Sequence, residues 1–416
     1  MAVFACAKEI LALSHHLGDA VFRRTHRARA RQRNRSVHLH YILVRKMNSF
    51  CGYLHLSNFG IMTNTPRRIK MKIYHLSHTD LDGYACQFVV NFYFKNVVFF
   101  NSNYGREISD TFVMILSRIE KDLTHNPNEK FLVLISDLNL NLTQCEDFEK
   151  ALQGKNAKLL LLDHHQSGLE CSQKYEWYFL DNARCAAKIV YEFFARICGE
   201  NEPLARFIAV VNAVDIWLKD DENFELGKVC LMMISTAKEI NRVMFNEQNI
   251  HYMFYLLEKA QSFIGKANSN IALEDSLHFL KKEFFKGEKN DTLGNLLSAF
   301  VVRLLRDNKE KLTLHYNGHK GILTYSIGNT SVIGNDFLLK EPEFDFFIDI
   351  SSKKTLSFRA NGKLDVSQMA QKLVGGGGHK NASGGLFVGF KDSSDYFIVK
   401  AQVEDLIKSK EMGVQK

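Results

Sequence analysis

The sequence predicts an α/β protein with a parallel sheet in one domain, joined by a helical segment to a smaller α/β domain. From residue 72 onward, short apolar runs alternate with segments of helical character, a pattern typical of parallel sheets with crossover helices. The chain has 416 residues, which is enough for two domains of ordinary size. Its 46% hydrophobic and 24% charged residues are usual for a globular protein.

The first domain is expected to contain four buried strands. These runs are apolar on both faces, which favours central strands covered by helices, and they span residues 72–76, 97–100, 131–135 and 159–162. Crossover helices are expected over residues 83–95 and 142–152. Two further helices are expected over residues 183–197 and 204–217.

The rest of the chain divides into a helical region and a second α/β region. Residues from about 220 to 300 are mostly helical in character and carry no motif. Later strands are expected near 320–327, 344–350 and 355–359. We therefore place the domain boundaries at residues 1–70, 71–220, 221–305 and 306–416.

The basic residues concentrate in the first part of the chain. The formal net charge is +8, but residues 1–70 alone carry +11, which leaves −3 for residues 71–416. A nucleic-acid contact would therefore have to come from a local cleft of the second part. Met71 directly precedes the first strand, so we favour it as the natural start, with residues 1–70 outside the fold and dispensable for activity. The alternatives are an Arg-rich transit peptide and a basic arm that grips phosphates.

The cysteines and the hydropathy indicate a cytoplasmic protein. The eight cysteines form no CxxC pair and no regular spacing, as expected of reduced thiols. There is no uncharged apolar run of about 18 residues or more, so no membrane span is predicted.

Acidic and imidazole side chains follow three of the predicted strands. Ligands collect at the carboxyl ends of parallel strands, so these side chains are expected to lie together. Taken singly, each motif is as well explained by a solvated turn or a helix cap, and their joint occurrence is what points to a site. The residues are His78, Asp80 and Asp82, then Asp137, then Asp163, His164 and His165, with Asp215 on a later helix.

So many carboxylates in one place would be costly without a counter-charge. Two divalent cations that share a bridging carboxylate would remove that cost and suit an in-line phosphoryl displacement. Oxygen and imidazole ligands without thiolate favour Mn²⁺, with Mg²⁺ or Co²⁺ as substitutes.

These motifs resemble those of a known family. HTDLDG, the SD after a buried strand, LLDHHQSG and the later helical Asp are similar to the four motifs of the DHH phosphoesterases. SFRANG and GGGGHKNASGG resemble the DHHA1 domain of that family, and the nearest subgroup is that of the nanoRNase B-like oligoribonucleases. The segment 181–184 departs from the family, which often has small hydroxyl residues there.

The resemblance implies a role for each site residue. One cation would be held by His78, Asp80 and Asp137, the last as the bridge. The second would be held by Asp82, Asp137, His164 and Asp215. His165 is then expected beside the reacting phosphate, with Asp163 orienting a histidine.

The second domain carries a run of glycines and an arginine that suit phosphate binding. Four consecutive glycines fit either a flexible loop or a nest of backbone amides around an anion. Arg359 could add bidentate recognition. The resemblance implies that this domain holds the terminal nucleotide of a short substrate, through Arg359, Gly375, Gly376, Gly377, Gly378 and His379.

The leading functional prediction is a two-metal phosphodiesterase that hydrolyses short single-stranded oligonucleotides. Alternatives are a phosphatase or phosphodiesterase of small nucleotides or cyclic dinucleotides, a single-strand DNA exonuclease of the RecJ type, and a nucleic-acid-binding protein without catalysis. The charge of −3 disfavours the RecJ type, which needs an extended basic groove. The sequence leaves RNA or DNA preference, polarity and oligomeric state open, a dimer included.

Overall fold

The computed structural model describes residues 71–287 and 290–412. The predicted N-terminal extension, residues 1–70, lies outside the described residues, and so do the three explanations offered for it. Within the described part, the predicted α/β class is confirmed, with one parallel and one mixed sheet.

The first sheet has five parallel strands in the order β2-β1-β3-β4-β5. Four of them coincide with the predicted apolar runs: β1 (Lys72–Ser77), β2 (Val97–Asn101), β3 (Phe131–Ser136) and β4 (Ala157–Asp163). The fifth, β5 (Tyr178–Leu180), was not predicted. The direction of winding reverses between β1 and β3, and the crevice at such a switch point is where ligands bind in open parallel sheets.

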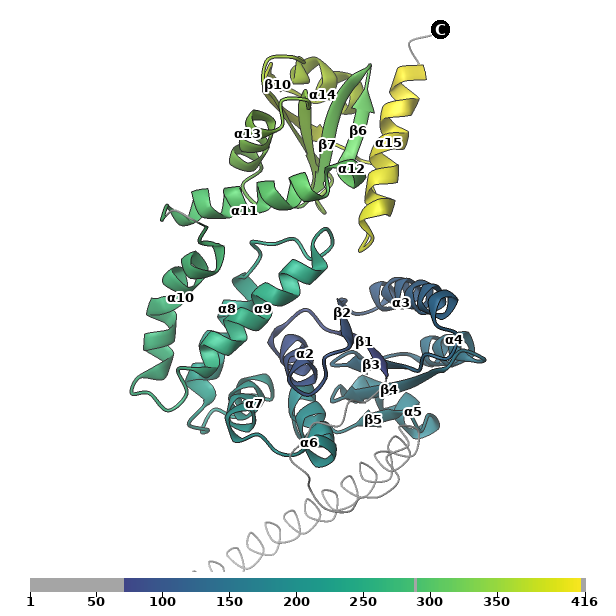
Figure 1. Ribbon diagram of the computed structural model, residues 1–416, viewed down its shortest axis with the longest axis vertical. Coiled ribbons are helices and arrows are strands. Elements are labelled where there is room, and N and C mark those ends of the chain that lie inside the picture. Colours follow the sequence, from purple (N-terminus) through teal and green to yellow (C-terminus); the bar gives the residue numbers. More distant parts are fainter. Residues whose placement is uncertain (1–70, 288–289, 413–416) are drawn as a thin grey trace, which may run out of the picture. The chain divides into compact units, whose positions relative to one another are not determined.

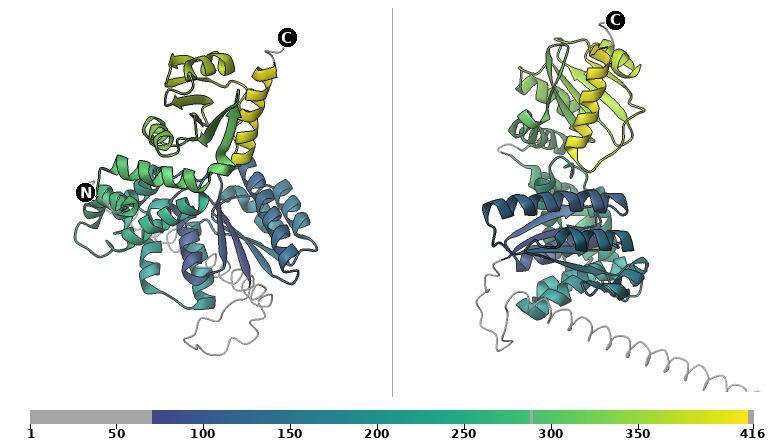
Figure 2. Two further views of the ribbon diagram at one scale, coloured as in Figure 1. Left: turned by 45° about the horizontal axis from the view of Figure 1, so that its top comes forward. Right: turned by 90° about the vertical axis from the view of Figure 1, so that its right-hand side faces the viewer.

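Helices cover both faces of this sheet, which explains why its strands are apolar throughout (Figure 1). On one face lie α3 (Arg106–His125) and α4 (Leu142–Leu152), which Figure 2 shows side by side. Phe112 of α3 stacks on Phe148 of α4, with ring centroids 3.6 Å apart. On the other face, α2 (Leu81–Tyr93) packs against α6 (Ala186–Cys198).

A helical region follows α6, as predicted for residues beyond 220. Its first helix ends at Asp215, a predicted metal ligand, and its second and third helices pack against α2. The elements are α7 (Glu202–Asp215), α8 (Phe224–Thr236), α9 (Asn246–Gln261), α10 (Ser269–Phe285) and α11 (Leu293–Asp307).

The second sheet has six strands in the order β10-β11-β9-β8-β7-β6. β7 and β8 are parallel, and the other neighbouring pairs are antiparallel. α13 (Thr330–Lys340) packs against β8 and β9, whereas α15 (Tyr396–Met412) packs against β7. The strands are β6 (Thr313–Tyr316), β7 (His319–Tyr325), β8 (Phe346–Ile350), β9 (Thr355–Ala360), β10 (Gly377–His379) and β11 (Ala382–Leu386).

The glycine run forms a helix cap and the start of a strand, where the sequence suggested a loop. Gly375 ends α14 (Val366–Val374) in the left-handed conformation, with φ of 63°. A Cβ at Gly376 would lie 2.2 Å from the carbonyl oxygen of Gly384, so this glycine lets the run pass close to β11. The run is therefore a helix cap that leads directly into the edge strand β10.

No helix of the described residues is long and apolar enough to cross a membrane. Five of the cysteines in this part of the chain are free thiols: Cys86, Cys145, Cys171, Cys185 and Cys230.

Candidate metal centre and active site

The predicted ligands come together where the first sheet reverses its winding. β1 runs into His78, and Asp80 caps α2 by accepting the amide of Gly83 at 3.0 Å. Asp137 follows β3 directly, with φ of 55°, a left-handed conformation that aspartate tolerates better than most residues. β4 leads into His164 and His165, while Asp215 arrives from the end of α7.

The side chains form overlapping groups of potential ligands, each within 4.8 Å. In the first group, Nδ1 of His78 lies 2.9 Å from Oδ2 of Asp80 and 3.8 Å from Oδ2 of Asp137. In the second group, His164 lies 3.8 Å from Asp82 through Nε2 and 3.6 Å from Asp215 through Nδ1.

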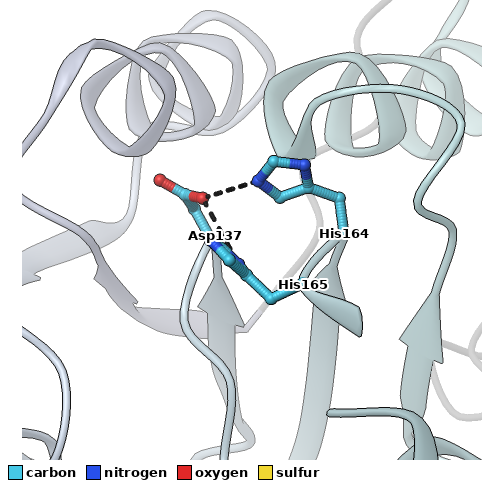
Figure 3. Close-up of side chains that lie close together, drawn as sticks. All are labelled: Asp137, His164 and His165. Carbon is cyan, nitrogen blue, oxygen red and sulfur yellow. Dashed lines mark ion pairs between the residues drawn. The ribbon is translucent and has the colours of Figure 1, made fainter. Parts of the chain in front are cut away.

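Asp137 belongs to more than one group. Its Oδ1 lies 3.4 Å from Nε2 of His164 and 4.0 Å from Nδ1 of His165 (Figure 3). Its other oxygen, Oδ2, faces His78. One carboxylate thus stands between the two sets of neighbours, which is the position that a bridging ligand would occupy.

Several buried polar atoms of this cluster lack a hydrogen-bond partner. They include Nδ1 of His78, Oδ2 of Asp137 and Nε2 of His164. Each lies near another potential ligand without making a hydrogen bond, although unsatisfied buried polar groups are rare and costly. Cations coordinated by these atoms would satisfy them. The donors are carboxylate oxygens and imidazole nitrogens, which suits a hard or borderline divalent ion.

The charges of the cluster lead to the same conclusion. Burial, followed by the charge of neighbouring aspartates, raises the pKa of Asp82 to about 6 and that of Asp215 to about 7. The same two causes raise the pKa of Asp137 well above its usual range. For Asp80 burial acts in the same direction, but the neighbouring imidazole of His78 lowers its pKa to about 2. Carboxylates in this arrangement need a positive counter-charge to ionise together.

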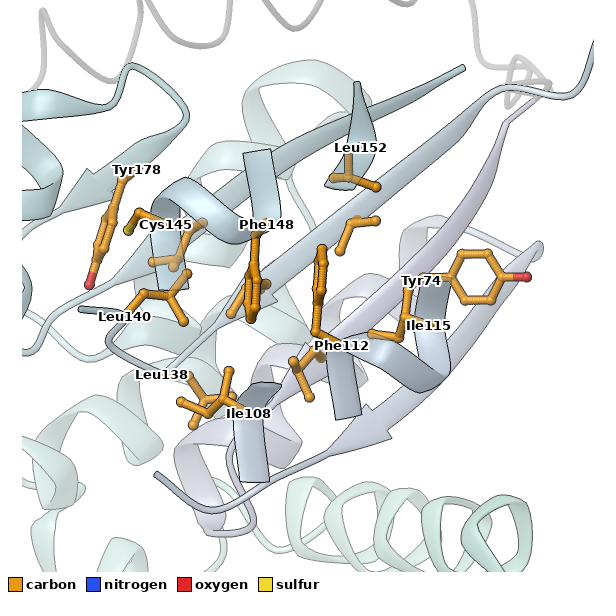
Figure 4. Close-up of a cluster of buried hydrophobic side chains, with 14 of the residues drawn as sticks. Tyr74, Ile108, Phe112, Ile115, Leu138, Leu140, Cys145, Phe148, Leu152 and Tyr178 are labelled. Carbon is orange, nitrogen blue, oxygen red and sulfur yellow. The ribbon is translucent and has the colours of Figure 1, made fainter. Parts of the chain in front are cut away.

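His165 is held by a chain of hydrogen bonds that runs into the domain core. Its Nδ1 lies 2.7 Å from Oδ1 of Asp163, and the hydroxyl of Tyr178 donates to Oδ2 of the same carboxylate at 3.1 Å. Tyr178 is fully buried and belongs to the hydrophobic cluster under α3 and α4 (Figure 4). The bond to Asp163 fixes the imidazole orientation and leaves Nε2 for a second partner.

Tyr104, on the loop between β2 and α3, is a site residue that the sequence reasoning missed. Its hydroxyl lies 2.9 Å from Nε2 of His165, and its ring lies 4.5 Å from that of His78 between centroids. Burial, then the charge of Asp137, raises the pKa of Tyr104. The phenol therefore stays protonated at neutral pH. The one feature of the sequence that could have indicated Tyr104 is its place just after β2, a strand that ends at the same sheet edge as β1.

The segment that departs from the family pattern builds the start of α6. Asp181 accepts the amide of Ala183 at 3.1 Å and binds Arg184 at 2.6 Å, and Arg184 also pairs with Glu192. The first amides of α6 point at the carboxylate of Asp82. This segment therefore positions a helix N-terminus at the site.

Both oxygens of Asp82 accept backbone amides from that helix. The amide of Ala186 donates at 2.7 Å and that of Ala187 at 2.8 Å. A helix N-terminus favours a negative charge. These bonds therefore fix Asp82 in place beside His164.

Comparison with known proteins decides the family. The chain is 43% identical over 350 residues to a 3′,5′-cyclic-nucleotide phosphodiesterase of Helicobacter pylori, an alignment that covers 82% of this chain and 99% of the relative. The chain belongs to the family of this phosphodiesterase. The motif residues that resemble those of the DHH phosphoesterases lie together at the sheet edge, and membership of that wider family stays a prediction.

Solved structures include a similar fold. The crystal structure of an uncharacterized protein from Helicobacter pylori G27 has a TM-score of 0.77 and 43% identity, covering 82% of this chain and 99% of that one. RecJ of Thermus thermophilus in complex with Mn²⁺ has a TM-score of 0.29 and 12% identity, covering 89% of this chain and 55% of that one. No family model matches the chain.

Two of the predicted substrate-binding residues, Arg359 and His379, share one face of the second sheet. Arg359 of β9 lies opposite Ala382 of β11, which in turn lies opposite His379 of β10. Residues directly opposite in antiparallel strands point to the same face, so Arg359 and His379 are separated only by a small side chain. The guanidinium of Arg359 donates to the hydroxyl of Ser331 at 2.6 Å.

The glycine run contributes less to such a site than the sequence suggested. The amide of Gly375 donates to the carbonyl of Gln371 at 3.0 Å, and that of Gly376 donates to the carbonyl of Ala370 at 3.1 Å. These two amides are therefore used within the cap of α14. The predicted anion site rests on Gly377, Gly378 and His379.

Proposed function

We propose that this protein hydrolyses the phosphodiester bond of a nucleotide at the edge of its first sheet, with two divalent cations bound there. The observation that carries the proposal is the position of Asp137 between two sets of ligands, with its carboxylate facing His78 on one side and His164 on the other. A shared carboxylate is what brings two cations close enough to act on one phosphate.

His78 and Asp80 would hold one cation with Asp137, and Asp82, His164 and Asp215 would hold the other with the same bridge. Mn²⁺ suits this mixture of carboxylate and imidazole, and Mg²⁺ or Co²⁺ could replace it. When bound, the two ions would supply positive charge to the phosphoryl oxygens and activate the attacking water.

The remaining site residues would handle the phosphate itself. His165 is oriented by Asp163 through Nδ1, which leaves Nε2 to bond a phosphate oxygen. Although burial alone would lower it, this contact raises the pKa of His165 above its usual value. The contact with Asp163 therefore favours the protonated imidazole, which carries a proton at Nε2. Tyr104, now 2.9 Å from that nitrogen, offers a neutral hydroxyl at the same place.

For the substrate, the name of the Helicobacter pylori relative favours a 3′,5′-cyclic nucleotide. A short oligonucleotide is the second candidate, favoured by the pairing of Arg359, Ala382 and His379 in one row. A cyclic mononucleotide has a single phosphate, which the cations would bind. Only a linear substrate or a dinucleotide has a second phosphate for this row.

One experiment tests the activity and separates the candidates. The purified full chain, with Mn²⁺, is given cyclic AMP, cyclic GMP, and 5′-labelled RNA and DNA of increasing length. Cleavage of any of these that is lost with a chelator and in Asp137→Asn supports the proposal. Cleavage of cyclic nucleotides alone selects the first candidate, and shortening of labelled chains selects the second. Metal binding without cleavage of any substrate would contradict a catalytic role.

A further inference from the structure

The C-terminal end of α7 has a tryptophan where glycine is usual. The amide of Leu218 donates to the carbonyl of Ala213 at 2.7 Å, and that of Trp217 donates to the carbonyl of Val214 at 3.3 Å. These two bonds form a Schellman motif, in which the residue in the left-handed conformation is most often glycine. Here that residue is Trp217, with φ of 57°.

Such a conformation is unfavourable for a large side chain. Among the other described non-glycine residues with positive φ, none is aromatic, and most are aspartate or asparagine, which tolerate it. They are Asp137, Asn268, Asn317, Ser326, Asn329 and Lys354. Strained backbone of this kind clusters at functional sites, where a side chain is needed in a particular place.

Burial in the core does not account for the strain. The indole of Trp217 packs edge-on against Phe224, with centroids 5.1 Å apart and planes at 88°. Even so, the residue remains 55% exposed. Glycine would form the same helix end at lower cost. The indole must therefore be explained by something outside the folded core.

The place of Trp217 in the chain connects it with the metal centre. It lies two residues after Asp215, whose carboxylate is 3.6 Å from His164, so their Cα atoms are at most about 7 Å apart. Residues 217–221 line an open, shallow surface depression of about 550 Å³, in which the indole stays accessible to a ligand. An exposed indole beside a phosphate-binding centre is suited to stacking on a base.

We propose that Trp217 stacks on the nucleobase of the nucleotide whose phosphodiester is cleaved at the metal centre. The inference rests on the proposed function and deepens it, because it requires a substrate that carries a base. Stacking tolerates different bases, since each has an aromatic face. Purine and pyrimidine substrates should therefore both benefit, with purines gaining more from their larger rings.

The test compares Trp217→Gly with the wild type on substrates with and without a base. Cyclic AMP and ribose 3′,5′-cyclic phosphate differ only in the adenine. Wild-type kcat/KM should favour cyclic AMP roughly 5- to 150-fold, mostly through KM, as expected for one stacked base. In Trp217→Gly this preference should disappear, and in Trp217→Phe most of it should remain. If the wild type cleaves short oligonucleotides instead, a dinucleotide and its abasic analogue replace this pair.

Glycine at this position should not harm the fold, because it is the residue that the helix end favours. Thermal unfolding of Trp217→Gly should therefore occur at the wild-type temperature or above it. The matched control is Trp177→Phe, which changes the other of the two tryptophans of the chain. Trp177 packs on the hydrophobic cluster under α3 and α4 and donates to Glu149. This control should keep the preference for cyclic AMP.

Binding of a nucleotide to Trp217 can also be measured without catalysis, by tryptophan fluorescence. In Trp177→Phe, Trp217 is the remaining tryptophan, and titration with AMP should quench its fluorescence, whereas ribose 5-phosphate should not. A preference for the base that survives in Trp217→Gly, or fluorescence that AMP leaves unchanged, would overturn the assignment of Trp217. If the wild type cleaves no nucleotide at all, the proposed function fails, and the AMP titration decides the role of Trp217 by itself.

Discussion

Gly168 and Tyr178 are in contact in a way that only glycine permits. A Cβ at residue 168 would lie 2.0 Å from the hydroxyl oxygen of Tyr178, the atom that donates to Asp163 at 3.1 Å. The glycine that ends the LLDHHQSG motif thus leaves room for the tyrosine that holds Asp163, and Asp163 in turn orients His165.

Gly168→Ala should therefore lower activity through His165. The added methyl group displaces the Tyr178 hydroxyl and leaves a buried carboxylate oxygen without its donor, at a cost of about 1–3 kcal/mol. We expect a loss of roughly 5- to 150-fold in kcat/KM with a lower unfolding temperature. In a Tyr178→Phe background Gly168→Ala should cause a smaller loss of kcat/KM, because the hydroxyl oxygen that the new methyl group would meet is absent. If the losses of the two changes are additive, Gly168 does not act through Tyr178. Gly294→Ala, where no atom lies within 4 Å, is the control.

Asp137→Asn should abolish most activity while keeping the backbone. Asparagine tolerates the left-handed conformation, so this variant removes the charge alone, whereas Asp137→Ala also strains the chain. We expect a loss in kcat/KM that exceeds that of Asp80→Asn, because the bridge would contact both cations. The measurement is kcat/KM together with metal content. Near-wild-type turnover with unchanged metal content would contradict the two-cation centre.

Divalent cations should stabilise the fold. A ligand that binds the native state alone, at 100 times its Kd, contributes about 2.7 kcal/mol, so Mn²⁺ should raise the unfolding temperature of the chelated protein by a few degrees. Calorimetry with and without Mn²⁺ measures the shift. Asp137→Asn should reduce it. An equal shift in that variant would place the bound ion elsewhere.

Arg359→Ala separates substrate binding in the second sheet from the chemistry at the first. Loss of a charge-assisted contact worth about 1.5–3 kcal/mol should lower kcat/KM for a short oligonucleotide roughly 10- to 150-fold. The small diester bis(p-nitrophenyl) phosphate has no second phosphate, so its kcat/KM should fall much less. The measurement is the ratio of the two losses. Equal losses would mean that Arg359 acts through stability or the metal centre.

Asp349 should make the protein less stable as the pH rises from about 4 to about 7. Burial raises its pKa to about 7, although Thr324 bonds its Oδ1 at 2.8 Å. In the unfolded chain the carboxyl of Asp349 loses its proton near its usual pKa, whereas in the folded protein it does so only near pH 7. The destabilisation of the fold by Asp349 therefore grows between these two pH values and is constant above pH 7. Asp349→Asn keeps the acceptor for Thr324. It should raise the free energy of unfolding at pH 8 but not at pH 4.

Asp345 provides a control of opposite sign for this measurement. Burial alone would raise its pKa, but contacts with His319 and Lys363 lower it. Its contribution is therefore stabilising above its usual pKa and is lost in acid. Asp345→Asn should lower the free energy of unfolding near neutral pH. Urea unfolding over this pH range measures both variants, and the same sign for both would contradict the assignment.

The strands that carry the predicted metal ligands could be recognised in the sequence because burial on both faces leaves an unbroken apolar run, as in β3. β5 and β10 have three residues each, too few for such a pattern, and their pairing depends on neighbours distant in sequence. The residues that cluster at the sheet edge were predicted because carboxylates directly after buried strands are unusual. Tyr104 and Trp217 were not predicted. A single aromatic residue forms no recognisable sequence motif, and its position relative to the site is known only from the folded backbone.

The two amides that Asp82 accepts come from residues 104 and 105 positions later in the chain. During synthesis, the first three motifs therefore leave the ribosome well before their scaffold is complete. A nascent chain that ends after β4 has Asp82 without its helix donors and lacks Asp215 altogether. The same holds for any fragment cut there, however well its strands pair. The smallest piece of this protein that can assemble the proposed metal centre must extend through α7.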